Sequence, residues 1–158
     1  SSGAILFNDL QAPSRARVVY RVRPITGFDP ELLSSADAPL TEYAGPLPAS
    51  RDSAPTPATI TQEGHDRVVV DVPETASPGV LILADTWYPG WRATVNGESA
   101  AVFPVDGMFR GVVLPEEGPH RVVFRYTPQS FQAGLGLSLL SALIALGGVF
   151  ATVRRKQA

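Results

Sequence analysis

Apolar and polar positions divide this chain into a long segment of short alternating runs and one uninterrupted apolar run near the carboxyl end. Residues 17–23, 65–72 and 120–126 place apolar side chains at every second position, which is typical of a half-buried β-strand. Residues 80–84 are almost continuously apolar, which predicts a central strand covered on both faces. The first part of the chain is therefore expected to form β-sheet.

Two dipeptides predict tight turns between short strands. Asn96-Gly97 follows the run at 91–95, and Asp106-Gly107 precedes the run at 108–114. Both dipeptides are typical of type I′ hairpins, in which the two central residues need positive φ. Seven or eight short strands with such turns predict a mainly β fold, an antiparallel β-sandwich of the jelly-roll or immunoglobulin-like type.

The amino-terminal third carries weaker signals. Asp29 is followed by Pro30, which is an N-cap residue before a proline at the first helical position, so a short helix is expected there. Residues 36–57 hold five prolines and predict an extended surface connection. We therefore expect residues 1–57 to supply a strand, a short helix and a Pro-rich connection packed on the sandwich, whose main strands occupy residues 58–127.

The apolar run from Phe131 to Val153 contains no charged residue. At about 1.5 Å rise per residue a helix of this length reaches roughly 35 Å, which is enough to cross a hydrocarbon core about 30 Å thick. The sequence thus predicts a transmembrane helix over residues 128–153. The basic residues of the tail at 154–158 predict a protein of the cell membrane with a cytoplasmic carboxyl end. Residues 1–127 are then expected outside the cytoplasm.

Small residues recur along one face of this predicted helix. A stripe of this kind allows close backbone approach and favours a partner helix within the bilayer, although small residues are also common in such segments generally. The stripe consists of Gly134, Ser138, Ser141, Ala145, Gly148 and Thr152.

The junction between the two parts leaves no room for a flexible linker. The last predicted strand ends at Tyr126, and Thr127-Pro128 has the pattern of an N-cap followed by the first helical residue. We therefore expect the sandwich to lie directly on the bilayer surface, with Tyr126 at the level of the headgroups.

Composition excludes several functions. The chain has 158 residues and a net charge of −2, so no overall basic field would attract nucleic acid. There is no cysteine, and His65 and His120 are far apart in sequence, so neither a metal site nor another cofactor site is expected. Asp85 and Asp106 fit turn positions better than a catalytic carboxylate pair, so no catalytic residue is assigned.

An aromatic cluster around Pro89-Gly90 is the most unusual local feature. Trp87, Tyr88 and Trp91 have the flat faces and polar edges against which sugar rings stack, and Arg92 is suited to bind a phosphate or carboxylate. These four residues are the candidate glycan-facing positions. The competing interpretation is that the aromatic side chains close one end of the sandwich core and that Arg92 is a solvated strand residue.

Three motifs together resemble the carboxyl-terminal end of bacterial YfhO-type membrane proteins. They are LILADTWYPGWRATVNG at 81–97, FRGVVLP at 109–115 and HRVVFRYTP at 120–128, followed by the apolar run. These proteins are similar to polytopic GT-C glycosyltransferases, which use lipid-linked sugars to modify cell-surface polymers. The resemblance implies further membrane helices upstream of Ser1 and a catalytic acidic residue in a loop that this sequence does not include.

Three functions fit these features of the sequence. The chain is either an external accessory domain of a GT-C-like glycosyltransferase that positions or selects a glycan acceptor, a membrane-anchored carbohydrate-binding module, or a structural cap without a ligand. The partners expected are the lipid bilayer, other transmembrane helices of the same parent chain, and a cell-surface glycan or lipid-linked sugar.

Overall fold

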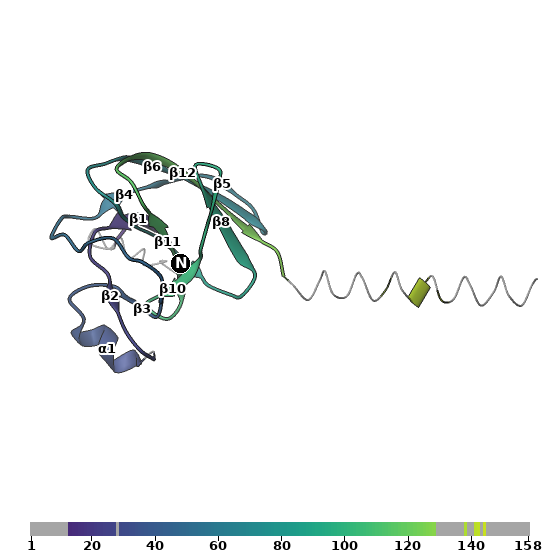
Figure 1. The fold of residues 1–158 in the computed structure, drawn as a ribbon, viewed down its shortest axis with the longest axis horizontal. Coiled ribbons are helices and arrows are strands. Elements are labelled where there is room, and N and C mark those ends of the chain that lie inside the picture. Colours follow the sequence, from purple (N-terminus) through teal and green to yellow (C-terminus); the bar gives the residue numbers. More distant parts are fainter. Residues whose placement is uncertain (1–12, 28, 129–137, 139–140, 143, 145–158) are drawn as a thin grey trace, which may run out of the picture.

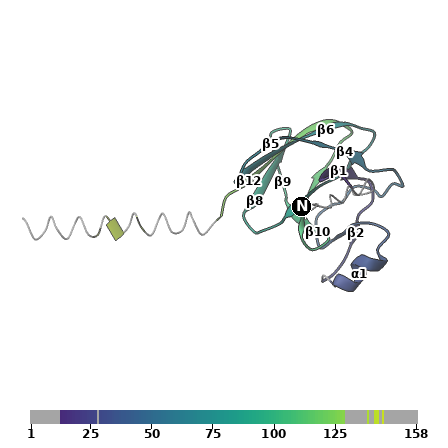
Figure 2. The same ribbon diagram turned by 180° about the vertical axis from the view of Figure 1, so that it is seen from behind.

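Two β-sheets form the body of the protein in a computed structural model that describes residues 13–27, 29–128, 138, 141–142 and 144 (Figure 1; seen from behind in Figure 2). Strand pairs are antiparallel except for β2 and β3, which are parallel. The seven-stranded sheet has the order β2 (Arg23–Pro24), β3 (Leu40–Thr41), β10 (Phe103–Val105), β11 (Phe109–Leu114), β7 (Gly79–Thr86), β1 (Ala16–Val19) and β4 (Thr56–Pro57). The five-stranded sheet has the order β5 (Thr59–Glu63), β6 (Arg67–Thr75), β12 (Gly118–Tyr126), β8 (Trp91–Val95) and β9 (Glu98–Ala100).

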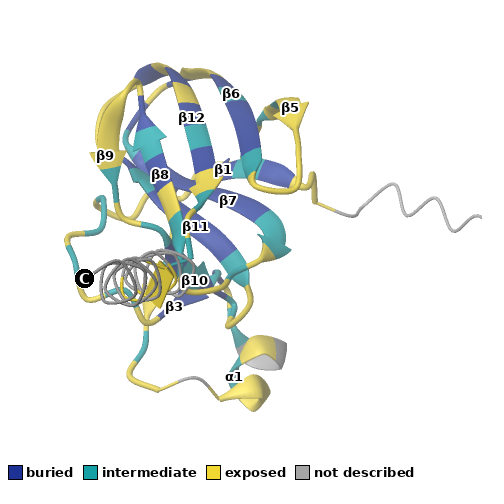
Figure 3. Ribbon diagram, turned by 90° about the vertical axis from the view of Figure 1, so that its right-hand side faces the viewer, coloured by how far each residue is buried: buried dark blue, intermediate teal, exposed yellow. Residues whose placement is uncertain are grey.

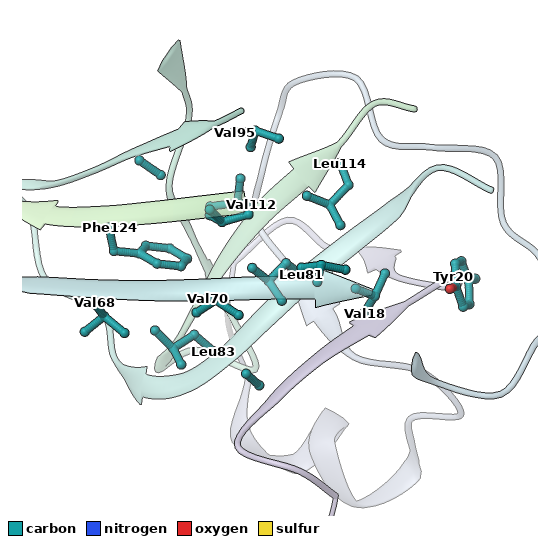
Figure 4. Close-up of a cluster of buried hydrophobic side chains, with 14 residues drawn as sticks. Val18, Tyr20, Val68, Val70, Leu81, Leu83, Val95, Val112, Leu114 and Phe124 are labelled. Carbon is teal, nitrogen blue, oxygen red and sulfur yellow. The ribbon is translucent and has the colours of Figure 1, made fainter. Parts of the chain in front are cut away.

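The main core lies between the two sheets. Phe124 and Val70 from the five-stranded sheet meet Leu81 and Val112 from the seven-stranded sheet, and all four are fully buried (Figure 4). Alternation along each strand directs these side chains inward, and burying this apolar surface is the main force that holds the sheets together. The predicted mainly β fold with two packed antiparallel sheets is confirmed.

A second apolar cluster covers the opposite face of the seven-stranded sheet. Val80 and Ile82 of β7 are buried on this side, and the ring of Tyr43 stacks on Phe103 with centroids 4.2 Å apart. Leu47 also packs against this cluster. The continuous apolar run of β7 is thus explained as predicted, because β7 has apolar neighbours on both faces.

The two predicted hairpin turns are confirmed. Asn96 has φ of 53° and Gly97 of 92°, while Asp106 has φ of 51° and Gly107 of 72°. The short helix is present as α1 (Pro30–Ser35), and the Asp29 carboxylate accepts a hydrogen bond from the backbone N–H of Glu31. These local signals succeed because each is decided within a few residues of chain.

The amino-terminal region differs from the sequence-based expectation in two places. The expected strand at 17–23 ends at Val19, and Arg23 pairs instead with Leu40 of β3. Tyr20 is buried, and its hydroxyl forms a 2.6 Å hydrogen bond with the Thr56 hydroxyl. The Pro-rich segment at 36–57 contains β3 and β4 and covers a sheet face, so it is more than a surface connection.

The predicted transmembrane helix at 128–153 lies almost entirely outside the described residues. The same holds for its small-residue stripe, of which only Ser138 and Ser141 are described, and for the basic tail at 154–158. Among the described residues, no helix combines the length and apolar character that a membrane crossing requires.

Candidate functional site

An open hollow of about 600 Å³ lies at the end of the sandwich where β12 finishes. Strand ends from both sheets contribute to it. Its lining consists of His65, Ala84, Asp85, Thr86, Tyr88, Trp91, Arg110 and Tyr126.

Arg110 is the buried polar centre of this hollow. Arg110 lies opposite Leu83 of β7 and alternates along β11 with Val112, so its side chain faces the core between the sheets. The Arg110 Nε donates a 3.0 Å hydrogen bond to the Thr86 carbonyl oxygen, and the guanidinium carbon lies 3.5 Å from the centroid of the Trp91 ring. This is a cation–π contact in a largely desolvated site.

One nitrogen of Arg110 has no hydrogen-bond partner. Its Nη1 is buried and lies 3.7 Å from Oδ2 of Asp85, close enough for an ion pair but too far for a hydrogen bond. Burial lowers the pKa of Arg110, the charge of Asp85 raises it, and the charge of Arg15 lowers it. The guanidinium remains protonated at neutral pH, since the ordinary pKa of arginine lies far above neutrality. An unsatisfied buried donor therefore lies beside the hollow.

Asp85 is held in place from the outside by Arg15. The Arg15 Nε donates a 2.8 Å hydrogen bond to Asp85 Oδ1, while both of its terminal nitrogens donate to the Glu63 carboxylate at 2.7 and 3.2 Å. The hydrogen bonds from Arg15 to Glu63 and then to Asp85 raise the pKa of Arg15. A chain of alternating charges thus runs from Glu63 through Arg15 and Asp85 to Arg110.

Glu63, at the outer end of this chain of charges, predicts an effect of pH on stability. Hydrogen bonds from Arg15, followed by its positive charge, lower the pKa of Glu63 in the folded state. A carboxyl group whose pKa is lower in the folded state than in the unfolded state stabilises the fold at pH values above its unfolded pKa of about 4.3. This stabilisation is lost as pH falls through the folded-state pKa. Between about pH 5 and pH 3 we expect the melting temperature of the wild type to fall more than that of Glu63→Gln.

The effect should be small because both partners are exposed and screened by solvent. The matched control is Glu98→Gln. It removes the same charge from a residue that forms no ion pair with any described residue. Thermal melts across this pH range in which Glu63→Gln follows the wild-type curve would contradict the prediction.

The turn at Pro89-Gly90 joins the hollow to the end of β12. Gly90 has φ of 109°, and its carbonyl oxygen accepts a 2.8 Å hydrogen bond from the N–H of Thr127. A Cβ on Gly90 would lie 3.2 Å from the Tyr126 ring, so this close approach favours glycine. The Tyr126 ring in turn lies 5.3 Å from that of Trp91.

The structure brings together two of the four candidate glycan-facing residues. Tyr88 and Trp91 line the hollow, and Tyr88 is 56% exposed whereas Trp91 is half-buried beneath Arg110. Trp87 does not line the hollow, and its backbone N–H donates to the Met108 carbonyl oxygen. Arg92 is exposed on the outer face of β8, away from the hollow.

Sequence reasoning missed Arg110 and Arg15 and gave Asp85 only a turn role. For Arg110 the signal was present, because alternation along the predicted strand at 108–114 puts it on the same face as Val112 and Leu114. Asp85 is the only carboxylate in the lining of the hollow among the described residues. The arrangement is therefore suited to binding a polar ring rather than to hydrolysis by two carboxylates.

The two histidines have different environments. His65 is exposed at the rim of the hollow. His120 is buried. Its Nδ1 pairs with the Asn96 amide at 3.2 Å and its Nε2 with the Glu116 carbonyl oxygen at 3.1 Å, so it joins two turns as part of the fold.

The fold and the hollow define a β-sandwich domain with a polar and aromatic site at one end. Residues 48–138 match the family described as bacterial membrane protein YfhO, and this chain belongs to that family. Membership places it among bacterial membrane proteins and confirms the resemblance noted in its motifs. Neither the curated proteins nor the solved structures compared with the chain provide a match.

Proposed function

We propose that this chain is an extracytoplasmic accessory domain of a polytopic membrane protein resembling GT-C glycosyltransferases, and that its open hollow positions or selects a glycan acceptor. The observation that carries the proposal is the combination of an exposed aromatic ring with a charged pair in which Arg110 is buried and Asp85 is partly exposed. Tyr88 presents its ring at the mouth, and Asp85 and Arg110 lie together in the lining.

The chemistry of the lining fits a sugar ring. Apolar C–H faces of a sugar pack on aromatic rings, and sugar hydroxyls both donate and accept hydrogen bonds. The carboxylate of Asp85 accepts, and the unpartnered Nη1 of Arg110 donates. A hydroxyl in the hollow would thereby satisfy a buried donor that the protein itself leaves without a hydrogen bond.

The position of the hollow supports an acceptor-binding role. Tyr126 is part of the lining and lies immediately before Thr127-Pro128, where the predicted membrane segment begins. An acceptor held here would lie close to the bilayer surface, where a lipid-linked sugar donor has its headgroup. The same site on a free-standing anchored module would bind a glycan without presenting it to an enzyme.

Tyr88→Ala provides the direct test. Stacking on an aromatic ring contributes on the order of 1 kcal/mol, so we expect roughly a fivefold to tenfold loss of affinity. The purified full chain in detergent would be tested on a printed array of bacterial cell-surface glycans. The control is Leu33→Ala, which removes another exposed apolar side chain from α1, outside the lining of the hollow.

Equal binding by Tyr88→Ala and the wild type would contradict a sugar platform at this position. Absence of any glycan binding by the wild type would favour the structural-cap alternative. In the parent protein, the accessory role predicts that Tyr88→Ala lowers glycosylation of the surface polymer at normal membrane abundance, whereas a purely structural role predicts no such loss.

A further inference from the structure

Three arginines form one row across neighbouring strands of the five-stranded sheet. Arg125 of β12 pairs directly with Arg67 of β6 on one side and with Arg92 of β8 on the other. Directly opposite residues of antiparallel strands share a face, with Cβ atoms about 4.5–5.5 Å apart. Their chain neighbours point into the core, so this arginine row faces outward.

The positive charge of this row is not balanced within the described part of the chain. No ion pair or side-chain hydrogen bond joins any of its members to another described residue. The Nε of Arg67 is buried without a hydrogen-bond partner. Asp66 supplies one carboxylate in the turn before Arg67, against the three positive charges of the row.

The same two central strands show the usual arrangement four residues further along. There Arg121 of β12 pairs with Asp71 of β6, and the Arg121 Nη1 lies 3.1 Å from Asp71 Oδ1. Like charges placed directly opposite one another destabilise a sheet, whereas opposite charges stabilise it. The unbalanced row therefore costs stability in the free protein, and a bound anion would remove that cost.

The row lies at the end of the sheet where the chain leaves the sandwich. Arg125 immediately precedes Tyr126, whose N–H donates a 2.8 Å hydrogen bond to the Asp66 carbonyl oxygen. Figure 3 shows the end of β12 and the start of β8 side by side, both with exposed residues. Arg92 and Arg125 are exposed, and Arg67 is half-buried.

We propose that the arginine row of Arg67, Arg125 and Arg92 binds the phosphate groups of anionic lipid headgroups at the bilayer surface. The guanidinium fork matches phosphate oxygens, and basic residues close to a membrane surface are attracted to anionic lipid. The family consists of bacterial membrane proteins, and the row adjoins the predicted start of the membrane segment, so lipid is the anion nearest to it. The contact fixes the orientation of the sandwich on the membrane.

This binding is separate from the proposed glycan site. The row is on the outer face of the five-stranded sheet, whereas Asp85 and Arg110 lie in the hollow at the end of the sandwich, and no arginine of the row lines that hollow. Either function can fail in an experiment while the other is retained.

Tryptophan fluorescence can measure whether the sandwich lies on the membrane. The chain's two tryptophans, Trp87 and Trp91, are both at the end of the sandwich that bears the row. The purified full chain would be reconstituted into vesicles of phosphatidylcholine alone or with about one third phosphatidylglycerol, each containing a headgroup spin-labelled lipid. We expect tryptophan quenching to be at least about twofold greater with phosphatidylglycerol at low salt, and to lose that excess at about 0.5 M salt.

Variants then connect the response to the row. The triple variant R67Q/R92Q/R125Q should remove the excess quenching, and R67K/R92K/R125K should retain most of it because the charges remain. The control R21Q/R23Q/R51Q removes three exposed arginines outside the row and should behave as the wild type. Glycan binding by R67Q/R92Q/R125Q, measured on the same array as Tyr88→Ala, should be unchanged.

Three results would overturn the proposal. The first is equal quenching in the two lipid compositions, and the second is an equal loss in R67Q/R92Q/R125Q and R21Q/R23Q/R51Q. The third is a response to soluble polyphosphate without a response to phosphatidylglycerol, which would assign the row to a polymeric anion instead of the bilayer.

Discussion

Replacing Phe124 with alanine is expected to lower the free energy of unfolding by about 3–5 kcal/mol. The Phe124 ring is fully buried between the sheets and lies directly opposite Val68 on one side and Ala93 on the other (Figure 4). Truncation removes apolar contacts and leaves a cavity that rigid strands cannot fill. Because domains of this size are stable by only about 5–15 kcal/mol, this is a large part of the total.

Urea unfolding followed by tryptophan fluorescence would measure the change. Phe124→Leu is the matched control, since it keeps most of the buried volume and should cost less than about 1.5 kcal/mol. The slope of free energy against urea should be the same in both variants if only stability has changed. Similar midpoints for Phe124→Ala and Phe124→Leu would show that Phe124 does not occupy a tightly packed core.

Replacing Arg110 with methionine should reduce both stability and glycan affinity. The variant keeps an unbranched side chain beside Trp91 but leaves the Thr86 carbonyl oxygen without its donor, at a cost of about 1–3 kcal/mol. It also removes the buried donor of the hollow. A hydrogen bond from a charged donor contributes about 1.5–3 kcal/mol, so glycan affinity should fall at least roughly tenfold.

The glycan array and urea unfolding measure these two losses separately. Arg110→Lys is the informative comparison, because it keeps the charge and loses the planar fork, so its affinity should be intermediate. Arg15→Met removes an exposed arginine from the same chain of charges and should have the smaller effect on stability. Full glycan binding by Arg110→Met would exclude this guanidinium from the site.

Features encoded by short stretches of sequence are predictable here. Asn96-Gly97 and Asp106-Gly107 adopt the positive φ values that their type of hairpin requires, and Asp29 caps α1 as expected. The apolar run of β7 also indicates its central position correctly, because only a strand covered on both faces can have apolar residues throughout. In each case the deciding interactions are local or depend on burial alone.

The Pro-rich segment shows where such reasoning fails. Tyr43 and Leu47 cover the outer face of the seven-stranded sheet, although their surroundings in sequence have no regular period. Their role depends on the buried face of β7 and on Phe103, which lie far away in the chain. A segment without periodicity can therefore be part of the core when it packs on the apolar face of a strand that is distant in sequence.

The sequence by itself determined the turns, most of the strands, the buried face of β7 and membership of a bacterial membrane protein family. Only the tertiary structure decided which polar residues meet. Arg110 of β11 meets Asp85 of the neighbouring β7 and Trp91 of the opposite sheet, and Arg67, Arg125 and Arg92 become neighbours through the pairing of three strands. Strand register and pairing are global properties of the packed sheets, so no local pattern of residues could specify either arrangement.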